Sequence, residues 1–81
     1  MDIKTAKKLC EKLETSKNVP DFVVAFVDEE AGSIVFASDL TGSHTLSLAD
    51  SDRARVLAHW DGFVSNNVAA ANREIDRLLG R

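Results

Sequence analysis

The chain has 81 residues, a length typical of one domain, and we expect a single domain over residues 1–81. Its 44% hydrophobic and 28% charged residues are usual for a globular protein and argue against disorder. No apolar run approaches the roughly 20 residues that a membrane span needs, and the first residues lack the apolar stretch of a secretion signal. The one cysteine, Cys10, cannot form an internal disulfide, so we expect a cytoplasmic protein.

The net charge of −3 is distributed unevenly along the chain. Residues 1–17 carry five lysines and three acids, and residues 53–81 carry five arginines and three acids. Residues 18–52 contain no lysine or arginine, but they contain seven acids: Asp21, Asp28, Glu29, Glu30, Asp39, Asp50 and Asp52. A strongly acidic middle third therefore lies between two weakly basic ends.

The first segment has the apolar spacing of a helix. Five residues fall on one face: Ile3, Ala6, Leu9, Cys10 and Leu13. Asp2 is a candidate N-cap, and we expect Asn18 followed by Pro20 to end the helix.

Three strands are predicted next, over residues 21–28, 33–38 and 44–48, with turns that contain Gly32 and Gly42. The first is apolar on both alternating faces, with Val24 and Phe26 on one face and Val23 and Ala25 on the other. A strand of this kind is covered on both sides, or on one side with a partner on the other.

The last segment predicts one helix from about residue 51 to residue 79, capped by Asp50 or Ser51 and ended by Gly80. Gly62 is a poor helix former, but the apolar phase continues through it, so we expect at most a kink there. The main apolar line contains Leu57, Trp60, Val64, Val68, Ala71, Ile75 and Leu78.

These elements predict an α+β domain in the order α-β-β-β-α, a three-stranded antiparallel meander with an N-terminal helix and a long C-terminal helix. Double-stranded-RNA-binding domains and small dimeric nucleoid-associated proteins share this element order. This chain contains no sequence motif of either class, and a shared order of elements alone says little about function.

No residue pattern indicates catalysis, a cofactor or a metal. His44 and His59 are the only histidines, and His59 has no histidine or cysteine one helical turn away, so we interpret His44 as a loop residue and His59 as a helix-surface residue. Cys10 lies among leucines and is expected to be a buried small hydrophobe. We therefore predict a protein that is not an enzyme and has no cofactor and no catalytic or metal site.

Two surfaces are candidates for binding. We expect the free acidic charge to gather at the turns, as an acidic partner-binding face of Asp28, Glu29, Glu30 and Asp39, although acidic turns also keep a protein soluble. The last helix carries a second apolar stripe at seven-residue spacing, Val56, Phe63 and Ala70, which predicts self-association as a homodimer unless the first helix covers it.

The leading hypothesis is a non-enzymatic protein-protein interaction protein that meets a partner with a basic surface. A specific version is a small acidic inhibitor, of the kind that phages or mobile elements encode, which blocks a nucleic-acid-handling complex. The alternative is a small dimeric nucleic-acid-binding regulator that uses the basic residues of its helices: Lys4, Lys7, Lys8, Lys12, Arg73, Arg77 and Arg81.

Overall fold

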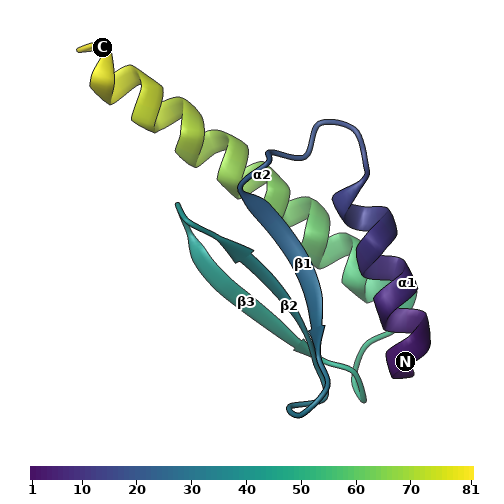
Figure 1. The fold of residues 1–81 in the computed structure, drawn as a ribbon. Helices are drawn as coiled ribbons and strands as arrows, with labels where there is room; N and C mark the ends of the chain where they lie inside the picture. The colour runs from purple at the N-terminus through teal and green to yellow at the C-terminus, as the bar shows by residue number, and fades with distance from the viewer.

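The computed structural model describes residues 1–81 and confirms the predicted α-β-β-β-α order (Figure 1). The elements are α1 (Ile3–Glu14), β1 (Val23–Asp28), β2 (Ser33–Ser38), β3 (Gly42–Ser47) and α2 (Arg53–Leu78). The strands form one antiparallel sheet in the order β1-β2-β3, and the predicted meander is therefore correct. No stretch of either helix combines the length and the apolarity needed to cross a membrane.

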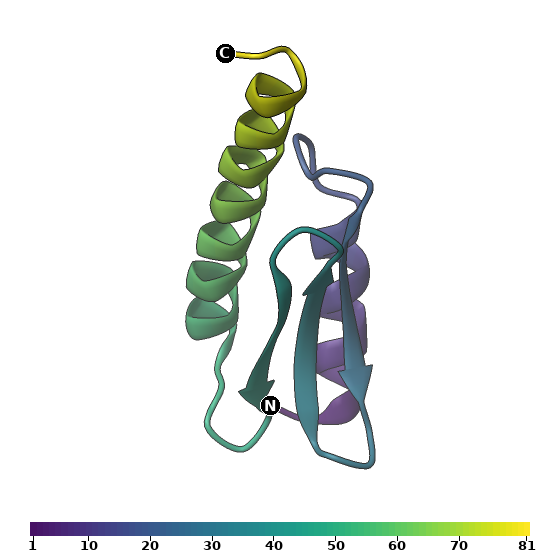
Figure 2. The ribbon, with the colours of Figure 1, turned by 90° about the vertical axis from the view of Figure 1, so that its left-hand side faces the viewer.

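Both helices pack on the same face of the sheet. Figure 2 shows α1 behind the strands and α2 on the side of β3, while no helix lies on the other face. The covered face receives the alternating side chains of all three strands, among them Ala25, Ile34 and Leu46, and these join one core cluster with Leu9 and Trp60 of the helices. The sheet thus has one buried face and one open face.

Phe36 of β2 is the centre of this core. Its side chain is fully buried, and its ring lies 5.0 Å from that of Trp60 and 5.7 Å from that of Phe63, measured between centroids. The edge-on contact with Trp60 is a favoured geometry for aromatic pairs. One strand residue therefore fixes how α2 lies on the sheet.

Side-chain hydrogen bonds define both ends of α1. The Asp2 side chain accepts from the Thr5 N–H, as the predicted N-cap requires. The helix α1 ends at Glu14, earlier than Asn18, because the hydroxyls of Thr15 and Ser16 donate to carbonyls of the last turn.

The N-cap of α2 is Asp52, one or two residues after the predicted cap. Its carboxylate accepts from the Arg55 N–H at 2.8 Å. Ser51 cannot serve as the cap because it is buried and its hydroxyl donates to the Ser47 carbonyl at 2.6 Å.

The helix α2 continues through Gly62 as predicted and contains one polar anchor. Asn67 is fully buried, its amide nitrogen donates to the Phe63 carbonyl, and its amide oxygen accepts from the hydroxyls of Ser38 and Thr41. Because Ser38 and Thr41 lie at the turn between β2 and β3, this side chain ties α2 to that end of the sheet. Beyond Asn67 the helix projects past the sheet (Figure 1).

Trp60, which belongs to the main apolar line of α2, is 3% exposed. We expect Trp60→Ala to lower the free energy of unfolding by about 3–5 kcal/mol, because it leaves a cavity against Phe36. Urea denaturation followed by circular dichroism measures this change. A loss below about 1 kcal/mol, the size of an average substitution, would show that Trp60 is not a core residue.

Gly62 faces open space, since an added Cβ would meet no atom within 4 Å. We expect Gly62→Ala to raise the free energy of unfolding by roughly 1 kcal/mol, because alanine is the better helix former. Gly42, which has a φ of +82°, is the matched control, and Gly42→Ala should destabilise the protein instead. Equal losses at both positions would contradict a continuous helix through Gly62.

Candidate functional site

The four acids predicted to form one face lie at two ends of the sheet. Asp28, Glu29 and Glu30 are at the turn between β1 and β2, whereas Asp39 is at the turn between β2 and β3. Six-residue antiparallel strands separate these turns by roughly 20 Å. The four acids therefore do not form one cluster, and their role in binding a partner stays a prediction.

Part of the acidic charge also has a structural role. Glu29 forms an ion pair with Lys7 of α1, with the carboxylate 3.0 Å from Nζ. The Asp28 carboxylate accepts from the Ala31 N–H at 3.2 Å and so shapes the tight turn. Of the predicted acids, Glu30 and Asp39 make no ion pair or side-chain hydrogen bond.

The open face of the sheet is apolar over β1 and β2. Phe26 is 47% exposed and Val24 is 39% exposed, although both lie within a strand. Their cross-strand neighbours on β2 are Val35 and Ala37, which are half-buried. These four residues, Val24, Phe26, Val35 and Ala37, form what we call the open-face patch.

Acids border the open-face patch at both ends. At one end, a hollow of about 520 Å³ is lined by Val24 and Ala37 together with Asp21 and Asp39. At the other end, Asp28 follows Phe26 at the alternating position of β1, on the same face. None of the three strands carries a lysine or arginine. The patch thus has an apolar centre and an acidic rim.

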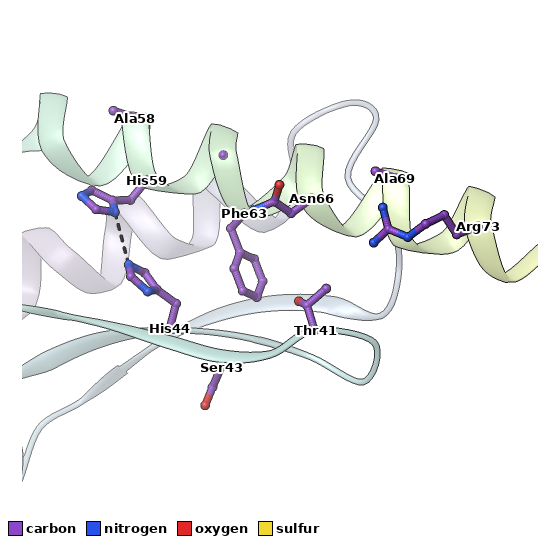
Figure 3. A pocket seen from close by; sticks show the side chains of 10 residues that line it. Thr41, Ser43, His44, Ala58, His59, Phe63, Asn66, Ala69 and Arg73 are labelled. Atoms are coloured by element: carbon purple, nitrogen blue, oxygen red, sulfur yellow. Dashed lines mark hydrogen bonds between the residues drawn. The ribbon is translucent and has the colours of Figure 1, made fainter.

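A second surface is a groove between β3 and α2, about 670 Å³ in volume (Figure 3). Its walls are Thr41, Ser43, His44, Ala58, His59, Gly62, Phe63, Asn66, Ala69 and Arg73. No carboxylate is among them. In Figure 3, Phe63 points from α2 toward the sheet between the histidines and Arg73.

The two histidines meet in this groove, which the sequence did not indicate. His44 lies in β3 and not in a loop, and its Nε2 is 3.2 Å from Nδ1 of His59 on α2. One ring nitrogen donates and the other accepts, according to the tautomer of each ring. Spacing could not reveal the pair, because its members lie on different elements, fifteen residues apart.

The predicted burial of Cys10 is confirmed. Cys10 is buried in the core cluster, and burial raises the pKa of its thiol to about 11, with a smaller contribution from the charge of Glu14. A thiol that stays protonated at neutral pH is a poor nucleophile. No three histidine, cysteine, aspartate or glutamate side chains come together as a group that could hold a metal ion.

The predicted self-association stripe is the sheet-facing side of α2. Val56 is fully buried, Phe63 is half-buried and packs on Phe36, and Ala70 is half-buried. The stripe therefore packs largely within the chain itself, and self-association through it stays a prediction.

The exposed apolar residues of α2 lie instead on its projecting end. Val68 is 41% exposed, Ile75 is 51% exposed and Leu78 is 71% exposed, and half-buried Ala71 completes the set. Their spacing of three, four and three residues is the a/d pattern of a coiled-coil seam, with β-branched residues at a. We call Val68, Ala71, Ile75 and Leu78 the α2 seam.

The basic residues of the two helices do not form one stripe. Arg77 and Arg81 of the projecting end are paired with Glu74 and Asp76. Lys4, Lys7, Lys8 and Lys12 are on α1, alongside the opposite half of α2, where Lys8, Lys12 and Arg53 line a pocket of about 180 Å³. A continuous cationic track for a phosphate backbone is therefore absent.

Comparison of the chain with protein-family models, with curated proteins and with solved structures found no match.

Proposed function

We propose that this chain is a non-enzymatic, cytoplasmic protein-protein interaction protein that binds its partner on the open face of its sheet. The observation that carries the proposal is the open-face patch, where a half-exposed Phe26 and its apolar neighbours sit inside an acidic rim. An apolar centre with a polar rim is the usual anatomy of a protein interface. Phe26 is the expected anchor, because aromatic residues dominate the binding energy of interfaces.

The acidic rim specifies the chemistry of the partner. Asp21, Asp28 and Asp39 favour an apolar surface bordered by lysine or arginine, and their field speeds the encounter with such a surface. A second copy of this chain is a poor occupant, because two acidic rims would repel each other. Inhibition of a nucleic-acid-handling complex by covering its basic surface is a specific form of this proposal. Direct binding of nucleic acid is disfavoured because the same rim repels phosphates.

A selection from a random peptide display library tests the chemistry without a known partner. We expect the selected peptides to be basic and apolar, and to shift the amide resonances of the open-face patch in the labelled protein. We expect Phe26→Thr, which removes the half-exposed ring, to weaken binding more than tenfold, and Val68→Thr, a change at a similarly exposed position on α2, to have no effect.

The rim is tested by a second pair of variants. Asp21→Asn with Asp39→Asn should weaken the selected peptides several-fold and reduce the salt dependence of binding, because surface charges contribute up to about 1 kcal/mol each. Asp61→Asn, an exposed aspartate on α2, is the control. Selection of acidic peptides, or resonance shifts away from the patch, would overturn the proposal.

The α2 seam gives the protein a second interaction, with another copy of itself. A two-fold pairing of projecting helices would bury the four seam residues, of which Val68, Ile75 and Leu78 are exposed in the single chain. This pairing leaves the open-face patch free, so that a dimer presents two partner-binding faces.

We expect Ile75→Glu to abolish self-association, because it places like charges at the centre of the seam. Sedimentation equilibrium over a range of concentrations measures the mass of the wild type and the variant. Phe26→Glu is the matched control and should leave the dimer intact. A wild-type mass of one chain at all concentrations would show that the seam does not pair.

A further inference from the structure

The two edges of the sheet differ in how their outward backbone groups are used. On β1, the Ala25 N–H donates to the Glu14 carboxylate at 2.8 Å, and the Val23 N–H donates to the Pro20 carbonyl at 3.0 Å. The edge of β1 is therefore largely occupied by the chain itself, which is how natural sheets prevent strand addition.

The edge of β3 has no such cover. The Leu48 N–H donates to the Gly32 carbonyl, so the even-numbered residues of this segment pair with β2, and the odd-numbered ones direct their N–H and C=O groups outward. The Ser47 carbonyl accepts from Ser51, but the backbone groups of Ser43 and Thr45 have no partner. The strand also contains no proline, lysine, arginine, aspartate or glutamate, the residues that usually protect a sheet edge.

The groove between β3 and α2 runs beside this free edge (Figure 3). The α2 side of the groove includes three small residues, Ala58, Gly62 and Ala69, and therefore leaves room for a ligand. A Cβ added at Gly62 would meet no atom within 4 Å. A strand added to β3 would lie about 4.8 Å from it and would direct every second side chain into the groove. There those side chains would meet the ring of Phe63 and the guanidinium of Arg73.

The charges that line the groove favour an acidic ligand. Arg73 makes no ion pair or hydrogen bond within the chain, and no carboxylate lines the groove. A second copy would bring its own β3, whose sequence GSHTLS contains no acid for Arg73. An extended peptide with an apolar and an acidic side chain on one face could contact all three features. Its apolar side chain would pack on Phe63, its acid would pair with Arg73, and its backbone would bind the free edge of β3.

We propose that the edge of β3 and the adjoining groove form a docking site for an extended acidic peptide, which adds to the sheet as a fourth, antiparallel strand. The side chains of the peptide alternate, so that an apolar residue packs on Phe63 and a glutamate or aspartate pairs with Arg73. The intervening residues use their backbone N–H and C=O groups to bind Ser43 and Thr45. This site adjoins the open-face patch, since Ser43 and Thr45 are the cross-strand neighbours of Ala37 and Val35, and it prefers the opposite charge.

The probe is the acetylated and amidated pentapeptide Thr-Leu-Thr-Glu-Thr, titrated into the labelled full-length protein by NMR. We expect resonance shifts and slower hydrogen exchange at the amides of Ser43 and Thr45. Arg73→Gln should weaken binding roughly tenfold, since a charged hydrogen bond is lost, while Arg55→Gln, which changes an unpaired arginine outside the groove, should not.

A chemical control leaves the protein unchanged. N-methylation of the threonines of the peptide should abolish binding, because their N–H groups face β3, whereas N-methylation of its leucine and glutamate should be tolerated. The proposal would be overturned if the peptide bound equally well with lysine in place of glutamate, or if both methylation patterns caused the same loss. Resonance shifts confined to β1 would also overturn it. Protection of Ser43 and Thr45 without peptide, together with a dimer mass that persists in Ile75→Glu, would show that a second copy occupies the edge.

Discussion

The fold depends on the packing of Phe36 between α2 and the sheet. This ring contacts Trp60 and Phe63, and through them it holds the first half of a long helix on one face of three short strands. A chain of 81 residues can bury only a small core. Here both α1 and α2 pack on the same face of the sheet and form that core with it. The opposite face of the sheet, the edge of β3 and the projecting end of α2 are left without a partner as a consequence. The three candidate binding surfaces therefore follow from one packing arrangement.

The order and the approximate bounds of the elements could be predicted because they depend on local signals. Strand residues alternate, helix residues repeat, and Asp2, Gly32 and Gly42 mark ends and turns by their own conformational preferences. The two apolar faces of β1 also indicated that the sheet would need a covering layer on each side, and the structure provides a layer on one side only.

The orientation of α2 could be predicted only in part from the same periodicity. Trp60 of the predicted apolar line is buried, and Leu57 and Val64 pack against the core, but Val68, Ile75 and Leu78 of the same line are exposed. The buried side includes Asn67, a polar residue whose role depends on Ser38 and Thr41 of a distant turn. The pairing of His44 with His59 and the separation of the four acids are likewise properties of strand register and not of sequence spacing.

The central claim is that one face of the sheet is open in the free protein. Paramagnetic relaxation of side-chain resonances by a soluble gadolinium chelate measures this directly, at a protein concentration where the mass is known. The account predicts strong relaxation at Phe26 and at the methyl groups of Val24, and weak relaxation at Ile34 and Val56, whose side chains are buried on the covered face. Weak relaxation at Phe26 and Val24 would mean that this face is already covered, and it would contradict the account.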